Sequence, residues 1–380
     1  MNLIKVDLSK PWLKAFIVGI LLLWAAGCTS DSKPPPEDAS TSPEMTPDAS
    51  MPKIDLHAHY RAQRDYLLPL FDSLNLQSLL VDVGRVDEEA WEKQRAGLIE
   101  NYQQHQEYYY FCTSFTANGI EHDDYADKII AHIQHDLDLG AVMVKVWKNF
   151  GMVSKDNAGN YVHIDDPRIQ PVWDFLIAER IPVLAHIGEP LQAWLPIDED
   201  NPHAGYYKNN PQYHAYQHPE IPSWETIQEA RNNWLAKNPD LIVVGAHNGS
   251  MSHDVQLIAQ TLDKYPNFYV EPAARFGDLV RQESSAVRSF IINYQDRFLY
   301  GTDLGTSADL EKMTEADISR EKQRIVDMLD RHWRYLSGSG MIDFTRSPTD
   351  SRQVEALNLP DSVLRKVYYH NAIKILKGNS

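Results

Sequence analysis

Short apolar segments alternate with amphipathic helical segments along most of the chain, and this alternation constrains the fold most strongly. Eight apolar runs rich in Val, Ile and Tyr are expected to be strands: Ile54–His57, Ser78–Val83, Tyr108–Phe115, Ala141–Trp147, Pro182–His186, Ile242–Ala246, Phe268–Glu271 and Phe298–Tyr300. Segments with helical spacing lie among them: Ala126–Leu139, Arg168–Glu179, Trp224–Asn238, Ser252–Lys264 and Val287–Tyr294. Such alternation implies parallel strands with right-handed crossovers. The sequence therefore predicts an α/β fold, a (β/α)8 TIM barrel in a single domain over residues 53–380.

Two long insertions interrupt this alternation. Residues 189–223 follow the fifth expected strand and are polar and aromatic. Residues 306–359 follow the eighth, are highly charged and are expected to be partly helical. Long loops after barrel strands usually build the mouth of the active site. We therefore expect both insertions to border an active site, the first of them as a lid.

The first 28 residues are expected to be a targeting signal. Three lysines precede an apolar run over residues 15–27, which leads to Cys28. This pattern is typical of a secretory signal, and the run is shorter than the roughly 20 residues of a membrane span. Trp24–Cys28 resembles a bacterial lipobox with Ala25 in place of the usual Leu, so we predict a lipoprotein signal peptide and a lipid on Cys28. An ordinary cleaved signal with an incidental cysteine, or an uncleaved anchor, is the alternative.

Residues 29–52 are dominated by Pro, Ser, Thr and acidic residues, which predicts a disordered tether. Together with a lipid on Cys28, this tether would hold the barrel at a bacterial cell membrane, facing the periplasm or the exterior. Cys112 would then have no disulfide partner, and its apolar surroundings predict a buried structural thiol.

The charge balance excludes some classes of partner. The chain of 380 residues has 36 Lys and Arg against 53 Asp and Glu, a net charge of -17. Nucleic-acid binding needs clustered basic residues, and a surface that rests on anionic lipid needs them too. We therefore expect neither a nucleic acid nor an anionic lipid surface as the direct partner of the folded domain, and the negative charge by itself names no substrate.

Histidine and aspartate side chains fall at the ends of four expected strands. His57 and His59 are two residues apart, so on a strand they point to the same side and can bind one ion. His186 and His247 close the fifth and sixth apolar runs, and Asp303 follows the eighth. Singly, a histidine at a strand end is more often structural than a ligand, and Gly-Thr-Asp could be a helix cap. Jointly, these five residues predict one site at the mouth of the barrel.

With this set of residues the chain resembles the amidohydrolase superfamily, and within it the type 2 branch. The resemblance covers about residues 53–377 and includes Lys366–Leu376, which is similar to the closing helix of the family. It implies a divalent metal held by the histidines and the aspartate at strands one, five and eight. These ligands are His57, His59, His186 and Asp303. Three imidazoles and a carboxylate suit zinc best, although manganese or iron could compete.

The resemblance also implies catalytic roles beside the ion. His247 would polarise the substrate or serve as a further ligand. Asp303 would act as the general base and take the proton from the metal-activated water, because a metal lowers the pKa of its water and a nearby carboxylate can accept the proton. The water would then attack a carbonyl or similar electrophile.

The number of metal ions depends on Lys145, which ends the fourth strand. Two-metal relatives use a carboxylated lysine there to bridge the ions, whereas the mononuclear branch has a lysine that does not bridge. We favour one ion, with Lys145 as a cation that faces the substrate or water. Lys148 lies three residues on and is expected to point to the opposite side of a regular strand.

Further residues are weaker candidates for substrate binding. Arg275 could hold a substrate carboxylate through two hydrogen bonds, or form a salt bridge to an acid. Glu271 could face the barrel interior or pair with Arg275. Glu189 and Tyr60 are further candidates for the pocket wall.

Three functions are compatible with these residues. The first is a metal-dependent hydrolase that cleaves an ester, lactone, amide or related bond of a small molecule. The second is a metal-dependent decarboxylase of a small carboxylic acid with the same ligands. The third, a non-catalytic ligand-binding lipoprotein, ranks last because every expected ligand position is filled.

Overall fold

The structure is a computed structural model, and it describes residues 48–198, 201–306, 310–347 and 350–378. The predicted signal peptide and residues 29–47 of the predicted tether lie outside the described residues. The chain divides into two units, residues 1–44 and 45–380, and every described residue belongs to the second. Within the described ranges, no helix is both long and apolar enough to cross a membrane.

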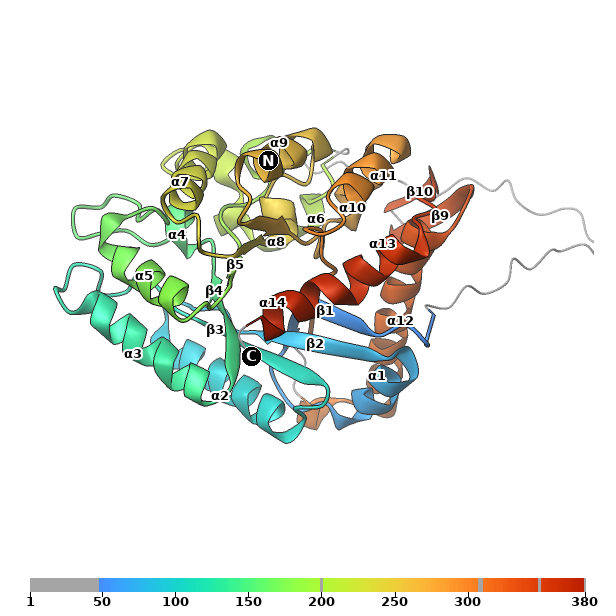
Figure 1. Cartoon of the computed structure of the whole chain (residues 1–380), viewed down its shortest axis with the longest axis horizontal. Coiled ribbons are helices and arrows are strands. Elements are labelled where there is room, and N and C mark those ends of the chain that lie inside the picture. Colours follow the sequence, from blue (N-terminus) through green and yellow to red (C-terminus); the bar gives the residue numbers. More distant parts are fainter. Residues whose placement is uncertain (1–47, 199–200, 307–309, 348–349, 379–380) are drawn as a thin grey trace, which may run out of the picture. The chain divides into compact units, whose positions relative to one another are not determined.

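Eight parallel strands form the wall of the barrel (Figure 1). They are β1 (Lys53–Tyr60), β2 (Leu76–Val81), β3 (Tyr109–Ser114), β4 (Ala141–Val146), β5 (Val183–Ala185), β6 (Val243–Gly245), β7 (Phe268–Val270) and β8 (Leu304–Thr306). Consecutive strands from β1 to β7 are neighbours, and β8 pairs with the other edge of β1. This order confirms the predicted α/β barrel.

The barrel closes between β7 and β1 through residues 297–300. Val270 on β7 donates to the carbonyl of Arg297 at 3.0 Å and accepts from the amide of Leu299 at 2.9 Å, while Leu56 on β1 donates to Tyr300 at 3.0 Å. The eighth strand was expected at Phe298–Tyr300, but this segment makes only an isolated bridge, and the regular β8 begins at Leu304. The reason is the turn at Asp303, whose φ of 63° interrupts the extended chain.

Helices cover the outside of the barrel between successive strands (Figure 1). The longer ones are α1 (Leu68–Leu74), α2 (Glu88–Gln104), α3 (Tyr125–Asp138), α5 (Gln170–Ala178), α7 (Trp224–Lys237), α9 (Val255–Lys264), α11 (Ser284–Asn293) and α12 (Glu315–Ser337). Sequence analysis located α3, α5, α7, α9 and α11 to within a few residues. It gave no bounds for α1 or α2, which carry weaker apolar patterns, although Asp87 caps α2 by accepting from the amide of Ala90.

The insertion after β8 is partly helical, as expected, and it also contains a hairpin that was not predicted. Helix α12 begins at a capping box made by Thr314 and Asp317. An antiparallel hairpin follows, formed by β9 (Met341–Ser347) and β10 (Asp350–Glu355). The hairpin joins α12 to the C-terminal helices, and its strand ends at residues 347 and 350 reach the cavity described below.

The C-terminal helices close one mouth of the barrel, as expected for the closing segment. They run from α13 (Asp361–Arg365) through a π-helical turn (Lys366–His370) into α14 (Asn371–Lys377), which lies across the strands in Figure 1. Ala372 and Ile375 pack in one apolar cluster with inward-facing strand residues such as Ile54, Leu184 and Leu299. Because this cluster fills the end at which the strands begin, any site must lie at their carboxyl ends.

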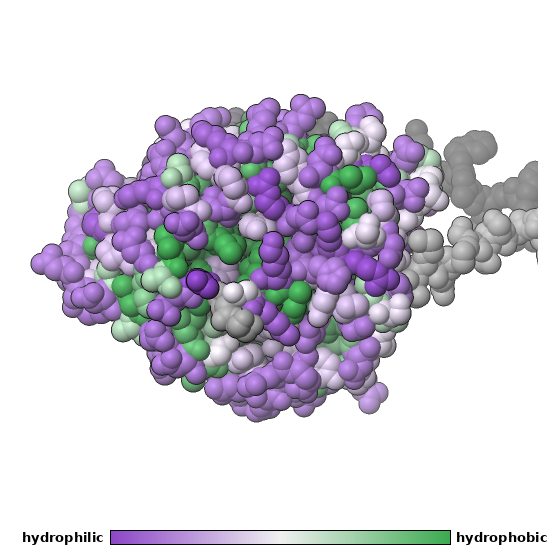
Figure 2. Space-filling model, in the orientation of Figure 1, coloured by the Kyte–Doolittle hydropathy of each residue, from purple (hydrophilic) through white to green (hydrophobic). Residues whose placement is uncertain are grey.

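A second apolar cluster lies between the barrel wall and the outer helices. The face of the molecule seen in Figure 2 is largely hydrophilic, with apolar side chains in smaller areas. Cys112 is buried inside the barrel, which confirms the expected buried thiol.

Candidate metal centre and active site

His57 and His59 reach the carboxyl end of the barrel because β1 is irregular. Its pairing with β2 shifts register between Asp55 and Ala58, as at a β-bulge. Leu56 and His57 can therefore both face inward, while Ala58 packs in the outer cluster. Asp55 fixes this bend, because its buried carboxylate accepts from the amides of His57 and Thr302 at 3.1 and 2.9 Å.

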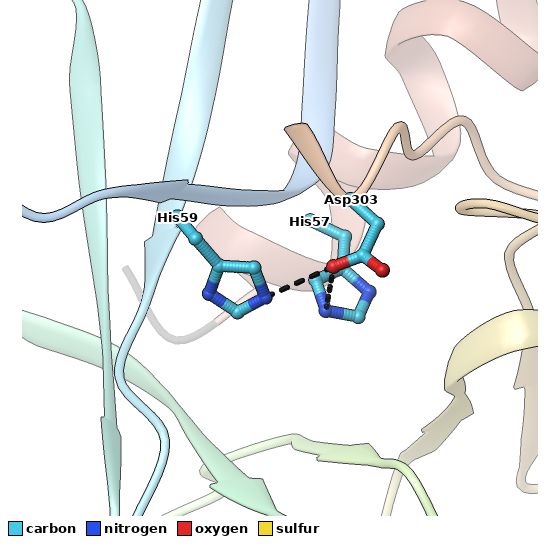
Figure 3. A group of neighbouring side chains, drawn as sticks. All are labelled: His57, His59 and Asp303. Carbon is cyan, nitrogen blue, oxygen red and sulfur yellow. Dashed lines mark ion pairs between the residues drawn. The ribbon is translucent and has the colours of Figure 1, made fainter. Parts of the chain in front are cut away.

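Both histidines point at the carboxylate of Asp303 (Figure 3). Asp303 Oδ1 lies 3.1 Å from His59 Nε2 and 3.7 Å from His57 Nε2. Ligand atoms of a tetrahedral ion with bonds of about 2.0–2.1 Å lie about 3.3 Å apart. The spacing of these two nitrogens and one oxygen therefore fits a small divalent ion between them.

The hydrogen bonds of the histidine rings leave the correct nitrogens available. Nδ1 of His59 bonds to the carbonyl of Val81 at 2.9 Å, and Nδ1 of His247 bonds to the carbonyl of Ala273 at 2.7 Å. A carbonyl oxygen only accepts, so each Nδ1 carries the hydrogen and each neutral ring keeps a lone pair on Nε2. Metal-binding histidines are usually oriented in this way by a second hydrogen bond.

Glu271 orients His57 in the same manner. Its Oε1 lies 2.8 Å from His57 Nδ1, and the carboxylate also accepts from the amides of His247 and Ala273. Glu271 is fully buried, and burial raises the pKa of its carboxyl group. A Cβ on Gly301 would lie 2.5 Å from Glu271 Oε2, so only glycine fits beside it. Sequence analysis noted Glu271 but gave it no role at the metal centre, although it follows a strand as the other site residues do.

His186 and His247 lie beside this group. Their ring centroids are 4.3 Å apart, and those of His57 and His247 are 5.0 Å apart. His186 Nε2 is buried without a hydrogen-bond partner among the described residues, as expected for an atom that awaits a ligand.

Two groups among the described residues have ligand atoms close enough to share an ion: His57, His59 and Asp303, and His57, His247 and Glu271. His186, which was predicted as the fourth ligand, is in neither group, so its role stays a prediction.

The charges of the site also favour metal binding. Burial works against ionisation of Asp303, yet its hydrogen bond to His59 and the neighbouring imidazoles hold its pKa well below the usual range. Burial lowers the pKa of His57, His186 and His247 well below the ordinary histidine value. An ionised carboxylate and neutral imidazoles are the forms that bind a metal.

Lys145 extends into the same centre from the end of β4. Its Nζ lies 3.4 Å from His57 Nε2, and the side chain is buried. Burial lowers the pKa of Lys145 to about 8. Carboxylation requires an uncharged amine, and the lowered pKa makes the uncharged form of Lys145 easier to reach.

Lys148 also turns into the site, against the expectation from strand alternation. The strand β4 ends at Val146, so the two-residue period no longer applies at Lys148. Its buried ammonium forms an ion pair with Glu189 and donates to the hydroxyl of Tyr206 at 2.8 Å. The ammonium also lies 3.5 Å from the ring centroid of Tyr213. Lys148 thus holds Glu189, which lines the cavity described below.

A cavity of about 660 Å³ opens over these residues. It is lined by His186, Glu189, Asp198, Asn201, Pro202, His203, Ala204, Gly205, Tyr206, Lys208, His247, Ala274, Arg275, Arg281, Asp303, Arg346, Ser347 and Asp350. Residues 198–208 belong to the insertion after β5, which includes α6 (Ala204–Asn209), and residues 346–350 belong to the hairpin after β8. Both insertions therefore border the site, as expected.

Tyr60 does not line this cavity, and the expectation that it would is wrong. Its ring is fully buried in the outer cluster, 5.7 Å from Phe71 and 6.4 Å from Tyr109 between ring centroids. The cause is alternation along β1: His57 and His59 face inward, so Tyr60 faces outward.

Comparison with known proteins agrees with the fold. The family model described as Amidohydrolase matches residues 54–378. A 2,6-dihydroxybenzoate decarboxylase from Rhizobium is similar in structure, with a TM-score of 0.51 and 14% sequence identity over 87% of this chain and 100% of that one. A dihydroorotase from Campylobacter jejuni has a TM-score of 0.45 and 12% identity over 86% of this chain and 83% of that one.

A TIM-barrel protein from Bordetella bronchiseptica has a TM-score of 0.46 and 16% identity, and covers 87% of this chain and 99% of that one. No match was found among curated proteins. At 14% identity, the similarity to the decarboxylase supports a shared fold and does not identify a substrate.

Proposed function

The chain belongs to the amidohydrolase family, and from that premise we propose that it is a metal-dependent hydrolase of a small molecule. The observation that carries the proposal is the meeting of His57, His59 and Asp303 at ligand spacing beneath the cavity. A divalent ion bound there would supply Lewis acidity, acidifying water and polarising the bond to be cleaved. Zinc suits the nitrogen and oxygen donors best, and we propose one ion per chain.

Asp303 is the proposed general base. Its carboxylate is one-third exposed to the cavity, whereas Glu271 is fully enclosed. Oδ1 faces the two histidines, which leaves Oδ2 to accept a proton from a water in the cavity. Because its pKa is held low, the carboxylate is ionised at neutral pH.

His247 is proposed to act through an unprotonated Nε2. Its Nδ1 hydrogen is committed to the carbonyl of Ala273, and burial keeps the ring neutral. A neutral ring in this tautomer accepts a hydrogen bond or binds a metal through Nε2, but cannot donate from it. This favours the role of ligand or acceptor over that of a donor to the substrate.

Turnover tests the proposal. We expect wild-type protein loaded with zinc to hydrolyse at least one member of a panel of aryl esters, lactones and amides. His57→Ala, or removal of the metal by a chelator, should abolish turnover while the circular dichroism spectrum is retained. Re-addition of zinc should restore the chelated enzyme and not the variant. Full activity in rigorously metal-free protein would refute the proposal, and close to two metal equivalents per chain would refute the single ion.

Decarboxylation is the second candidate, and the buried Arg275 in the cavity lining favours it. A guanidinium can hold a carboxylate group of a substrate in a fixed orientation. Release of carbon dioxide from a panel of aromatic acids, measured beside the hydrolysis panel, separates the two reactions. Metal-loaded protein inactive in both panels would favour the third function, a non-catalytic ligand-binding protein.

We also propose that the enzyme is anchored to a bacterial cell membrane by a lipid on Cys28 and faces the periplasm or exterior. The support is the lipobox-like sequence before Cys28. Expression in a bacterial host with radiolabelled palmitate should label the wild type and not Cys28→Ser. An unlabelled wild-type protein would contradict the anchor and leave the proposed chemistry untouched.

A further inference from the structure

Arg275 has hydrogen-bonding capacity that the protein does not use. It follows Ala274, whose φ of 57° turns the chain after β7 so that both residues line the cavity. The side chain is only 11% exposed. Its Nε has no hydrogen-bond partner among the described residues, and Nη1 makes one long contact of 3.3 Å to the carbonyl of Ala274. A buried guanidinium with unmade hydrogen bonds costs free energy unless a ligand completes them.

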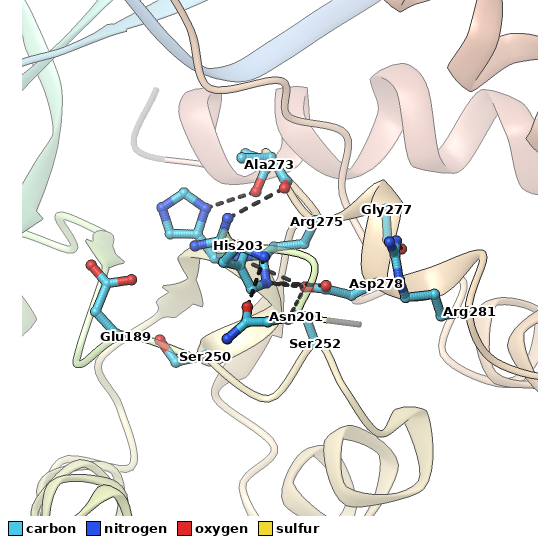
Figure 4. Close-up of polar contacts among 12 residues, drawn as sticks. Glu189, Asn201, His203, Ser250, Ser252, Ala273, Arg275, Gly277, Asp278 and Arg281 are labelled. Atoms are coloured by element: carbon cyan, nitrogen blue, oxygen red, sulfur yellow. Dashed lines mark hydrogen bonds and ion pairs between the residues drawn. The ribbon is translucent and has the colours of Figure 1, made fainter. Parts of the chain in front are cut away.

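The nearest carboxylate is already engaged by other groups. Asp278 lies 4.0 Å from Arg275 Nε, beyond hydrogen-bonding distance. The Oδ2 atom of Asp278 accepts instead from Ser252 at 2.5 Å and from His203 Nε2 at 3.2 Å, as Figure 4 shows. Asp278 thus offsets the charge of Arg275 and leaves the donors of its guanidinium free to bind an anion in the cavity.

A second group of cations lies at the mouth of the same cavity. Arg281 and Arg346 both contact the carboxylate of Asp350, at 3.1 and 3.3 Å. Two guanidiniums therefore share one acid. Arg281 also donates to the carbonyl of Gly277 at 2.6 Å, and a Cβ on Gly277 would lie 1.9 Å from Nη1 of Arg346. A side chain at residue 277, which lies beside Arg281 in Figure 4, would displace the guanidinium of Arg346.

The acids of the lining are mostly engaged elsewhere. Asp303 belongs to the metal centre, Glu189 pairs with the buried Lys148, and Asp350 is shared by two arginines. Asp198, the fourth carboxylate of the lining, also has an interaction partner. Guanidiniums stay charged at every physiological pH, so the lining presents fixed positive charge at two places, one deep and one at the mouth.

From these contacts we infer that the cavity takes a small dicarboxylate. This inference rests on the proposed function and names its substrate class. One carboxylate binds Arg275 next to the metal centre. The other binds the Arg281–Arg346 pair at the mouth, where Arg346 from the β9–β10 hairpin selects for it. A neutral compound of the same shape would leave both groups of donors unpaired and would bind more weakly.

Binding of inert probes tests the inference. The three benzenedicarboxylate isomers span a range of carboxylate spacings, and benzoate and isophthalamide serve as the one-carboxylate and uncharged probes. Each is titrated into zinc-loaded protein by isothermal calorimetry. We expect at least one isomer to bind roughly tenfold or more tightly than benzoate, and isophthalamide to bind least. Isophthalamide binding as tightly as every dicarboxylate would overturn the inference.

Two variants separate the two subsites. Arg275→Gln should weaken binding of benzoate and of the dicarboxylates alike, by about tenfold or more, because it removes a charged hydrogen bond from a buried place. Arg346→Gln should weaken only the dicarboxylates, by about three- to tenfold. Arg365→Gln is the matched control: Arg365 also pairs with an aspartate four residues away, but it does not line the cavity. Equal loss of benzoate and dicarboxylate binding in Arg346→Gln would overturn the second subsite.

The readouts distinguish this inference from the proposed function. Binding of an inert dicarboxylate requires neither turnover nor a particular reaction. Protein that hydrolyses an uncharged ester but ignores the dicarboxylates would keep the function and lose the inference. Protein that binds dicarboxylates through Arg275 and Arg346 but lacks metal-dependent turnover would keep the inference and lose the proposed function.

Discussion

Substitution of Glu271 by Gln tests the metal centre without touching any of its predicted ligands. Glu271 Oε1 receives hydrogen bonds from His57 Nδ1 at 2.8 Å and from the amide of His247 at 3.2 Å. Oε2 receives the amide of Ala273 at 2.5 Å. A glutamine has the same shape but one oxygen and one NH2 group, so it can serve only one of these two sides.

The loss of metal affinity in Glu271→Gln depends on whether the NH2 group of the glutamine faces Ala273 or His57. If it faces Ala273, His57 keeps a neutral acceptor at Nδ1, and the loss should be near tenfold in metal affinity. If it faces His57, the ring must accept at Nδ1 and carry its hydrogen on Nε2, where the metal needs the lone pair. The loss should then approach 100-fold, so the full range is about 1.4–2.7 kcal/mol, as for other residues that orient metal ligands.

Competition with a chromophoric zinc chelator measures this affinity directly. Glu189→Gln is the control, because Glu189 is an equally buried carboxylate in the same cavity that pairs with Lys148 and contacts no predicted ligand. We expect Glu189→Gln to keep wild-type zinc affinity within about twofold, a difference below about 0.5 kcal/mol. If Glu271→Gln binds zinc as tightly as the wild type, or if both variants lose the same amount, the orienting role of Glu271 is refuted.

Three further predictions concern stability, measured by urea unfolding. Lys148→Met should destabilise the protein by about 3–5 kcal/mol, because it leaves Glu189 buried and unpaired. The double variant with Glu189→Gln should recover most of that loss. Equal stability of the single and double variants would contradict the pairing. Leu299→Ala should cost about 2–5 kcal/mol, since Leu299 is fully buried inside the barrel; a loss below 1 kcal/mol would contradict its place there. Burial opposes ionisation of Asp278, but His203 and other partners lower its pKa to about 2. The ionised carboxylate therefore contributes stability above about pH 4, and this contribution is lost as the pH falls toward 2. Asp278→Asn should therefore flatten the decline in unfolding free energy between pH 4 and pH 2.5, and an unchanged slope would contradict the shift.

The sequence predicted the barrel well because its signals are local. Each strand carries an apolar run, and the outer helices α3 and α7 have helical spacing over their full length. The predicted strand at Phe298–Tyr300 does bond to β7 and β1, but the turn at Asp303 separates it from the regular β8, and no apolar pattern marks that turn. The β9–β10 hairpin was not predicted, because its strands are mostly exposed and lack an alternating apolar face.

The site was predictable where strand alternation applies, and not beyond it. His57, His59 and Asp303 follow from their positions at strand ends, and the structure brings them together. Lys148 lies past the end of β4, where alternation says nothing about direction. Arg346 is 71 residues beyond Arg275 in the chain. No local pattern predicts that a hairpin places both arginines in one cavity.

The backbone at the site adopts conformations that local propensity does not predict. His247, Asn248, Ala274 and Asp303 all have φ near 60°, a conformation that costs a residue with a side chain about 1–2 kcal/mol. Three of them donate a backbone amide hydrogen bond to a neighbouring chain segment. Asn248 donates to the carbonyl of Glu271, Ala274 to that of Thr302, and Asp303 to that of His57. The strained turns are therefore held by the segments that close the barrel. The same hydrogen bonds position the ligand residues, so the geometry of the metal centre depends on closure of the barrel between β7 and β1. A change that opens the barrel there should weaken metal binding before it unfolds the outer helices.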